Sequence, residues 1–246
     1  MRKIAFSNQK GGVAKTTSCI NIGGGLSQLG YKTIIIDLDT QGQISQALGL
    51  NPELDLSDLF FNDCDLQDVI IQARENLFII AGGQKLASVK REIARRDISP
   101  ERALCEVLSG LNSFDFCLVD TAPSWDVLNI NCLFFVDSVI VPVSMEVLAL
   151  QGIVSFLQNV EEIKKHRNEL EIKWIVPTFY DARVKKSGEI LAQLKKYFGA
   201  KITEPIRYNV KLSEAPGFGQ HIFEYNRRSY GANDYAKLIE RILQNE

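Results

Sequence analysis

Short apolar runs alternate with longer amphipathic segments along the whole chain. The runs are rich in valine, isoleucine and phenylalanine, which is typical of buried parallel strands. Between them, apolar residues recur at a spacing of three to four, as expected for helices that pack on a sheet; examples are 16–29, 148–167 and 229–243. This alternation predicts an α/β fold, with a mostly parallel, twisted sheet of about seven strands and helices on both faces. The expected strands are 4–6, 32–39, 77–81, 116–120, 139–143, 174–179 and 202–208.

Length and composition favour one domain that covers residues 1–246. The chain has 246 residues, 46% of them hydrophobic, which is enough to bury a full core. No apolar run reaches the roughly 18 residues that a membrane span needs, and the first motif begins within the first dozen residues. We therefore expect a cytoplasmic protein without a signal peptide. Five cysteines without a Cys-x-x-Cys pair argue against a disulfide framework, a zinc site and an iron–sulfur cluster.

Charge is distributed unevenly although the net charge is only −2. Residues 171–246 hold 13 Lys and Arg against 9 Asp and Glu, whereas residues 1–170 hold 15 against 21. A basic C-terminal third in an acidic protein suggests a local binding face. A second basic run at residues 90–96 falls on a helical segment. We interpret that run first as a solvated face, ahead of a contact for a partner or DNA.

Residues 7–17, Ser-Asn-Gln-Lys-Gly-Gly-Val-Ala-Lys-Thr-Thr, lie where the first strand is expected to turn into a helix. Gly11 and Gly12 let the backbone curl so that successive N–H groups point inward, and the helix N-terminus adds positive potential. Lys15 is then placed to reach the β- and γ-phosphates of a nucleotide, and the Thr16 hydroxyl to bind Mg²⁺. The stretch therefore predicts a polyphosphate site.

Carboxylates follow two of the expected strands at their carboxyl ends, where ligands bind in open α/β sheets. Asp37 and Asp39 end the second run, and Asp120 ends the run 116–120 before Thr-Ala-Pro. An apolar strand that ends in aspartate is the form of a Walker B site, whose carboxylate holds Mg²⁺ directly or through water. Together with residues 7–17, these acids predict a metal–nucleotide site.

The strict P-loop pattern is not met, because Gln9 and Ala14 stand at its two glycine positions. The pattern present, Lys10-Gly-Gly-x-x-Lys15-Thr, resembles the deviant Walker A motif of the ParA/MinD family of ATPases, of the small ParA or Soj-like type. The resemblance extends over nearly the whole chain and implies a P-loop NTPase fold. Because an alanine held at positive φ costs about 1 kcal/mol or slightly more, we expect Ala14 to keep a negative φ.

The resemblance implies the cofactors ATP and Mg²⁺ and assigns roles to residues of this sequence. Lys10 reaches across a nucleotide-sandwich homodimer to the partner's phosphates, in the manner of an arginine finger. Asp39 positions the attacking water, so the implied catalytic residues are Lys10, Lys15 and Asp39. The implied metal-site residues are Thr16, Asp37 and Asp120. The implied nucleotide-binding residues are Lys10, Gly11, Gly12, Val13, Ala14, Lys15, Thr16, Thr17, Glu146, Arg207 and Asn209, the last two at the adenine.

The resemblance also implies a DNA-bound function. ATP-driven dimerisation joins two basic surfaces, so that the dimer binds DNA of any sequence and a ParB-like or adaptor protein on a cargo stimulates slow hydrolysis. Plasmid or chromosome partition at the nucleoid is the leading role, and positioning of a large protein assembly such as a bacterial microcompartment is the alternative. The candidate DNA-binding residues are Arg183, Lys185, Lys186, Lys195, Lys196, Arg207 and Lys211.

Four other classes stay open at this point. A MinD-like membrane ATPase is disfavoured, because residues 242–246 end polar and acidic rather than in an amphipathic tail. An iron-protein-like reductase would need paired cluster cysteines, and Cys117 and Cys132 fall inside an expected strand and a helix. A small-molecule ligase leaves Lys10 without a purpose. A non-catalytic ATP-dependent scaffold differs only in lacking hydrolysis, which an Asp39→Ala variant tests.

Overall fold

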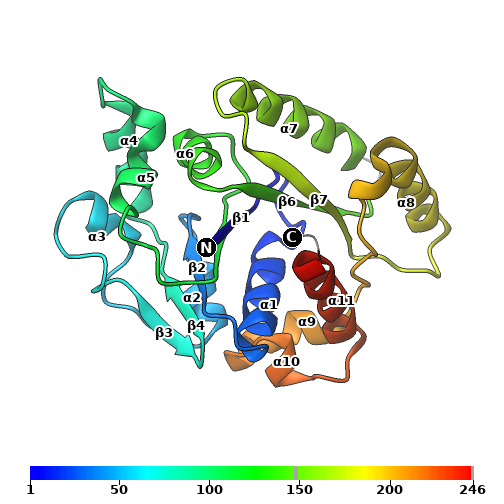
Figure 1. The fold of residues 1–246 in the computed structure, drawn as a ribbon. Helices are drawn as coiled ribbons and strands as arrows, with labels where there is room; N and C mark the ends of the chain where they lie inside the picture. The colour runs from blue at the N-terminus through cyan, green and yellow to red at the C-terminus, as the bar shows by residue number, and fades with distance from the viewer. Residues whose placement is uncertain (147–148, 245–246) are drawn as a thin grey trace.

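The computed structural model describes residues 1–146 and 149–244 and holds a central seven-stranded sheet in the order β3-β4-β2-β5-β1-β6-β7 (Figure 1). All neighbouring strands are parallel except β3 and β4, which form an antiparallel pair at one edge. The carboxyl ends of β1, β2 and β5 meet in the middle of the sheet. The strands are β1 (Arg2–Phe6), β2 (Thr33–Asp37), β3 (Ile71–Arg74), β4 (Leu77–Ile80), β5 (Phe116–Asp120), β6 (Ser138–Ser144) and β7 (Glu171–Thr178).

Helices cover both faces of the sheet, as the apolar pattern predicts (Figure 1). On β2, Ile34 and Ile36 pack into the core on one face and Ile35 into the core on the other, since successive strand side chains point in opposite directions. The helices α1, α2, α10 and α11 share the core of Ile35. The helices are α1 (Lys15–Gln28), α2 (Gln43–Ala47), α3 (Leu56–Phe60), α4 (Leu86–Ala94), α5 (Ala103–Val107), α6 (Val127–Phe135), α7 (Ala149–Lys164), α8 (Lys185–Phe198), α9 (Val210–Glu214), α10 (Ile222–Tyr225) and α11 (Tyr230–Gln244).

Short 3₁₀ turns connect some of these helices, namely Pro100–Arg102, Gly199–Lys201 and Ala215–Phe218. The predicted start of α7 at Leu148 lies outside the described residues. No helix in the described parts of the chain is long and apolar enough to cross a membrane. All five cysteines are free thiols, and Cys19, Cys117 and Cys132 are buried in the core.

The number of strands is as predicted, but the prediction of a last strand at 202–208 is wrong. That segment makes only isolated bridges, from Ile202 to Ile175 of β7 and from Arg207 to Tyr180 just after β7. Pro205 and its neighbour Pro177 on β7 have no N–H group, so a continuous ladder cannot form between them. The seventh strand is β3. Its polar residues Gln72 and Arg74 interrupt the apolar pattern, so the pattern did not predict it.

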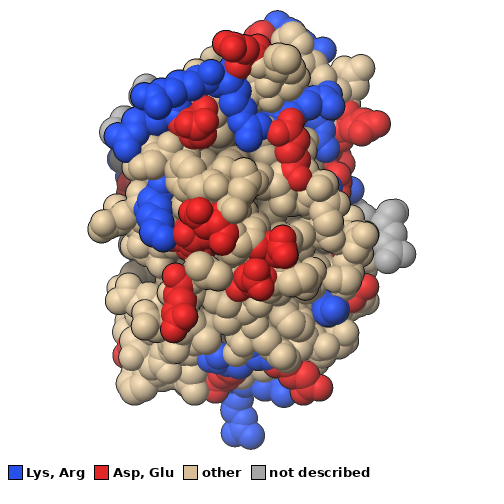
Figure 2. All heavy atoms as spheres, turned by 90° about the vertical axis from the view of Figure 1, so that its left-hand side faces the viewer, with Lys and Arg blue, Asp and Glu red and all other residues tan. Residues whose placement is uncertain are grey.

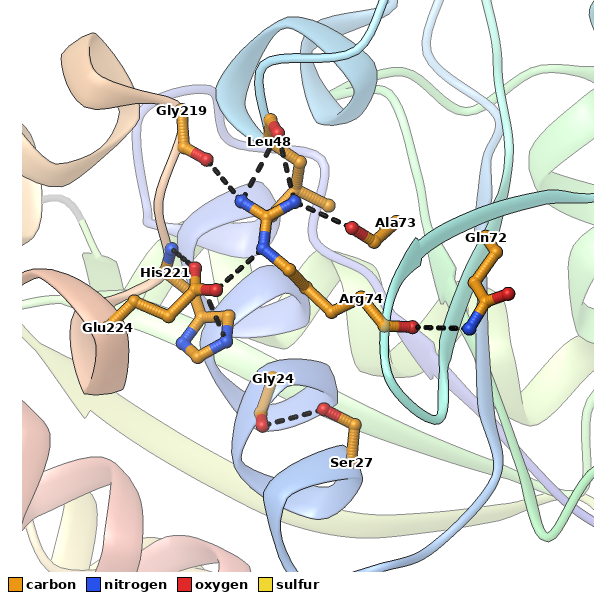
Figure 3. Close-up of polar contacts among 9 residues, drawn as sticks. All are labelled: Gly24, Ser27, Leu48, Gln72, Ala73, Arg74, Gly219, His221 and Glu224. Carbon is orange, nitrogen blue, oxygen red and sulfur yellow. Dashed lines mark hydrogen bonds and ion pairs between the residues drawn. The ribbon is translucent and has the colours of Figure 1, made fainter.

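Arg74 of β3 ties this sheet edge to the C-terminal part of the chain (Figure 3). Its guanidinium donates to the carbonyl oxygens of Leu48 after α2 and Gly219 before α10, and its Nε lies 2.6 Å from Glu224. Glu224 in turn lies 3.5 Å from the buried His221, whose pKa is lowered by burial. One side chain thus holds three separate segments together beside the end of α2.

The three glycines of α1 make close approaches, but only one of them faces the sheet. A Cβ on Gly23 would lie 2.7 Å from Ile35 of β2. On Gly24 it would meet His221, and on Gly25 it would lie 2.2 Å from Ile239 of α11. Gly23 therefore lets α1 pack closely on the sheet, whereas Gly24 and Gly25 admit His221, directly before α10, and α11.

Candidate functional site: a phosphate loop with a magnesium-type acid pair

The loop between β1 and α1 curls as a phosphate cradle at the carboxyl edge of the sheet. Its base is fixed by Asn8, which donates to the carbonyl of Pro142 at 2.8 Å, and by the Thr178 hydroxyl, which donates to the carbonyl of Val13 at 3.2 Å. Gly12 has φ +69°, a conformation that glycine adopts without strain. The loop is therefore anchored to β6 and β7 before any ligand binds.

The expectation of a negative φ at Ala14 is wrong. The residue has φ 66° and ψ 35°, in the left-handed region. The reason is geometric: Ala14 is the N-cap of α1, and its carbonyl accepts the first helical bond from the Ser18 N–H at 2.9 Å. To turn from the curled loop into the helix the backbone must pass through this conformation, and the rest of the fold offsets its cost.

Lys15 and Thr16 open α1 and point into the site from its N-terminus. The Lys15 ammonium donates to the Lys10 carbonyl at 3.2 Å, and burial lowers its pKa although Asp120 and Asp39 oppose the shift. The Thr16 hydroxyl donates to Oδ2 of Asp120 at 2.6 Å across 104 residues of sequence. The structure thus joins the two halves of the predicted metal site.

The environment of Asp120 suits a carboxylate that binds a cation. It is almost fully buried at the end of β5, and burial followed by the neighbouring Asp37 raises its pKa well above the ordinary value. Its Oδ1 atom has no hydrogen-bond partner among the described residues. A hydroxyl and a carboxylate oxygen beside bound phosphates are the ligands that Mg²⁺ prefers, so Thr16 and Asp120 fit that ion.

Asp37 shapes the loop after β2. Its Oδ1 accepts the Asp39 N–H at 2.9 Å, and its Oδ2 accepts the Ile44 N–H of α2 at 3.1 Å. Burial raises its pKa to about 6, although these two backbone bonds oppose the shift. Asp37 therefore anchors the turn into α2, and its predicted place near Mg²⁺ stays a prediction.

Asp39 lies in the open cleft above the phosphate loop. It is half-buried, and its Oδ1 accepts the Gln41 N–H at 3.0 Å. The cleft measures about 540 Å³ and is lined by the loop, by the segment after β2 and by the segment after β5. Its lining residues are Gly11, Gly12, Ala14, Lys15, Thr16, Thr17, Asp39, Thr40, Gln41, Gln43, Lys90, Ala122, Pro123, Ser124 and Phe179.

Two lining residues of this cleft, Lys90 and Phe179, were missed from the sequence. Phe179 directly follows β7 and has φ 55°, which is rare for an aromatic residue. Lys90 comes from α4, about fifty residues beyond the loop that carries Asp39. Neither lies in a recognisable motif, so only the folded arrangement identifies them.

Lys10 precedes the glycines and is turned toward the end of β6. Its ammonium lies 2.5 Å from Glu146 and 3.4 Å from the Ser144 hydroxyl. The exposed fractions of the two charged side chains are 32% for Lys10 and 66% for Glu146. Both predicted residues therefore lie together on an open surface, where a second molecule can reach them.

The two residues predicted at the adenine are engaged elsewhere. Arg207 makes a bidentate ion pair with Asp234 of α11, with a shortest distance of 2.6 Å. Its guanidinium also lies over the Tyr230 ring. Asn209 caps α9 by accepting the Lys211 N–H at 2.9 Å. Their role in adenine binding stays a prediction.

A second cavity of about 330 Å³ adjoins the first, because Thr16, Thr17 and Gln43 line both. Apolar atoms supply most of its surface, from Ile20 of α1 and from Leu212 and Pro216 near the C-terminus. A flat base fits such a cavity better than a charged group does. The Leu-Ser-Glu-Ala-Pro stretch that contains Leu212 and Pro216 was the available sequence signal.

The predicted DNA-binding residues separate into two groups. Arg183 and the four lysines lie on α8 or just before it and are exposed, although Arg183 pairs with Asp181 at 2.7 Å. In the described structure no acidic group pairs with Lys186, Lys195 or Lys196. Arg207 and Lys211 lie apart from α8 and are paired with acidic residues of their own.

Comparison with known proteins agrees with this site. An AAA domain model matches residues 1–172. The chromosome-partitioning ATPase Soj of Treponema pallidum is 37% identical over 98% of this chain and 97% of its own, and the sporulation initiation inhibitor protein Soj of Bacillus subtilis is 36% identical over 98% of each. A crystal structure of cobyrinic acid a,c-diamide synthase from Mycobacterium smegmatis, with bound ATP analogue and magnesium, has a TM-score of 0.86 at 27% identity, covering 99% of this chain and 95% of that one.

The family match and the geometry lead to the same assignment. The AAA domain model spans the phosphate loop, Asp39 and Asp120, and the two Soj proteins match nearly the full length. Similarity on this scale, with a lysine directly before the two loop glycines, shows that the chain belongs to the ParA/MinD family of ATPases.

Proposed function

We propose that the protein hydrolyses ATP to ADP and phosphate with Mg²⁺, slowly until a partner protein stimulates it. The observation that carries this proposal is the Thr16–Asp120 pair, with its orphaned carboxylate oxygen, at the mouth of a phosphate cradle. Bound Mg²⁺ supplies charge neutralisation at the phosphates. Lys15 and the loop N–H groups bind the phosphate oxygens, and Asp39 orients the attacking water from the open side of the cleft.

The proposed active site is complete only in an ATP-dependent homodimer. Lys10 is exposed and paired with Glu146 within its own chain. An exposed pair of this kind contributes little, about 0–1 kcal/mol, so triphosphate on a second subunit competes for the ammonium easily. Each subunit would then contribute its Lys10 to the partner's phosphates.

The proposed dimer binds DNA without sequence preference. The exposed cations of α8 and its preceding turn form a basic surface on one subunit, and dimerisation would double it. If each subunit neutralises about three phosphates, affinity falls with salt at a slope near −5 on logarithmic axes. The proposed role is partition of a chromosome or plasmid at the nucleoid, since two of its relatives are Soj proteins and one of these is a chromosome-partitioning ATPase. A ParB-like protein is the proposed activator.

The test measures binding to a random-sequence duplex with ATP, ADP or no nucleotide, at several salt concentrations. We expect binding with ATP alone and its loss in Lys10→Ala. The matched control is Lys165→Ala, because Lys165 is also exposed and paired, with Glu162 of α7, but lies away from the loop. Equal DNA binding in all three nucleotide states would overturn the switch.

Hydrolysis needs a separate variant. Asp39→Ala should retain ATP binding and ATP-driven dimers and lose phosphate release, because among the described residues the Asp39 side chain accepts its hydrogen bond from Gln41, outside the phosphate loop. Sedimentation with ATP reports the dimer, and a phosphate assay reports turnover. Unchanged phosphate release in this variant would remove Asp39 from the mechanism. Phosphate release that requires a small-molecule acceptor would favour a synthase instead.

A further inference from the structure

The basic run on α4 does not face solvent along its whole length. Figure 2 shows Lys and Arg side chains gathered along the upper rim of the face on which α4 lies, above scattered acidic side chains. Arg91 and Arg95 are exposed, as a solvated face predicts. Lys90 is different: its side chain is only 24% exposed and lines the cleft that holds Asp39. By contrast, Lys85 at the start of the helix is 61% exposed.

Lys90 is held at the rim of the cleft by one carboxylate. Its ammonium lies 2.6 Å from Oδ2 of Asp126, which also accepts the Ser124 hydroxyl at 2.8 Å. The other oxygen of Asp126 caps α6 by accepting the N–H groups of Leu128 and Asn129. Asp126 therefore keeps its place through backbone bonds even when Lys90 leaves it.

The segment that carries this carboxylate borders the phosphate loop. Pro123 lies against the loop, since a Cβ on Gly11 would be 3.7 Å from the Pro123 ring. Pro123, Ser124 and Lys90 line the cleft together with the glycines of the loop. A ligand held by the loop therefore occupies a cleft that Lys90 also lines.

Lys90 supplies positive charge to the cleft from outside the phosphate loop. Among the described residues that line it, Lys15 and Lys90 are the only cations. Lys15 belongs to the loop, so Lys90 is the one cation among the described lining residues that comes from another segment. A lysine has a flexible four-carbon stem with three rotatable donors, and its bonds to ionised phosphate are among the stronger protein hydrogen bonds.

We propose that Lys90 exchanges Asp126 for the terminal phosphate of a bound nucleoside triphosphate, and that it thereby distinguishes the triphosphate from the diphosphate. This inference rests on the proposed ATP site and adds a ligand to it from α4. In the nucleotide-free protein, Asp126 holds the ammonium at the rim. When the terminal phosphate arrives, its greater charge takes the ammonium from Asp126, and α4 moves with it relative to the segment after β5.

The test compares ATP and ADP affinity, with Mg²⁺, in five variants of the full chain. Lys90→Gln should weaken ATP binding about tenfold and ADP binding less than twofold, because only the terminal phosphate reaches Lys90. Asp126→Asn keeps the helix cap, since asparagine caps as well as aspartate. It frees Lys90, so ATP should bind a few-fold tighter. The double variant should bind ATP as Lys90→Gln does.

Lys85→Gln is the matched control, because Lys85 also pairs with an aspartate, Asp58 at 2.9 Å, outside the cleft. It should leave both affinities unchanged. Lys90→Arg retains the charge and should retain most of the preference for ATP, which guards against a folding defect in Lys90→Gln. Equal losses for ATP and ADP, or weaker ATP binding in Asp126→Asn, would show that the pair only holds the fold and would overturn the proposal. A wild-type protein that binds neither nucleotide would instead refute the proposed function.

Discussion

Replacement of Ala14 by glycine should stabilise the protein, although it adds flexibility next to a binding loop. Ala14 has φ 66° and ψ 35°, and its carbonyl starts the hydrogen-bond ladder of α1. This conformation destabilises the folded state by about 1–2 kcal/mol for any residue with an L-configured Cβ. Glycine avoids that cost, but its greater freedom in the unfolded chain lowers the free energy of unfolding by about 0.4–1 kcal/mol. The expected net gain in the free energy of unfolding is therefore about 0.5–1 kcal/mol.

Thermal and urea unfolding without nucleotide measure this difference. For a chain of this length, about 1 kcal/mol corresponds to roughly 2–4 °C in Tm, so we expect a rise of about 2 °C. The reciprocal control is Gly30→Ala, at φ +92° just past the end of α1, with no atom within 4 Å of the added Cβ. It imposes the same kind of backbone strain without a steric clash, and should lower the Tm.

A lower Tm in Ala14→Gly, together with the expected loss in Gly30→Ala, would refute the reasoning. It would mean that Ala14 carries no strain in its left-handed conformation. If both substitutions behave as expected, the loop stores strain at the point where the phosphates bind. That outcome would agree with the tendency of strained backbone to collect at functional sites.

Two further predictions follow from burial in the core and at the site. Gly25→Ala should cost about 1–3 kcal/mol in thermal unfolding, because its Cβ would lie 2.2 Å from Ile239, whereas Gly188→Ala, in open space on α8, should gain up to about 1 kcal/mol. For Asp37, whose pKa rises from 3.8 to about 6, the folded state binds the proton more tightly, so its stabilising contribution is complete below about pH 4 and lost above pH 6. Between pH 5 and 7.5 this group should lower the free energy of unfolding by roughly 1 kcal/mol, and an equal pH slope in Asp37→Asn would contradict the assignment.

The fold class and the centre of the site could be predicted because they depend on local patterns. The central strands and the long helices each have their own apolar period. Lys15 and Thr16 begin a helix, Asp39 follows a strand and Asp120 ends one. In a parallel sheet such positions meet at one edge whatever the connections between them. That Thr16 and Asp120 lie close together could be predicted for that reason, although 104 residues separate them, whereas the bond between them comes from the structure.

The sequence by itself determined the phosphate loop, the acids at the strand ends, the alternation of strands and helices, and the family resemblance. Only the tertiary structure decided that Ala14 turns left-handed and that β3 rather than 202–208 completes the sheet. It also decided that Arg207 pairs with Asp234 and that α4 brings Lys90 into the cleft. These features arise from contacts between elements whose own periodicity carries no information about their neighbours, so packing and backbone geometry select them only when the whole chain folds.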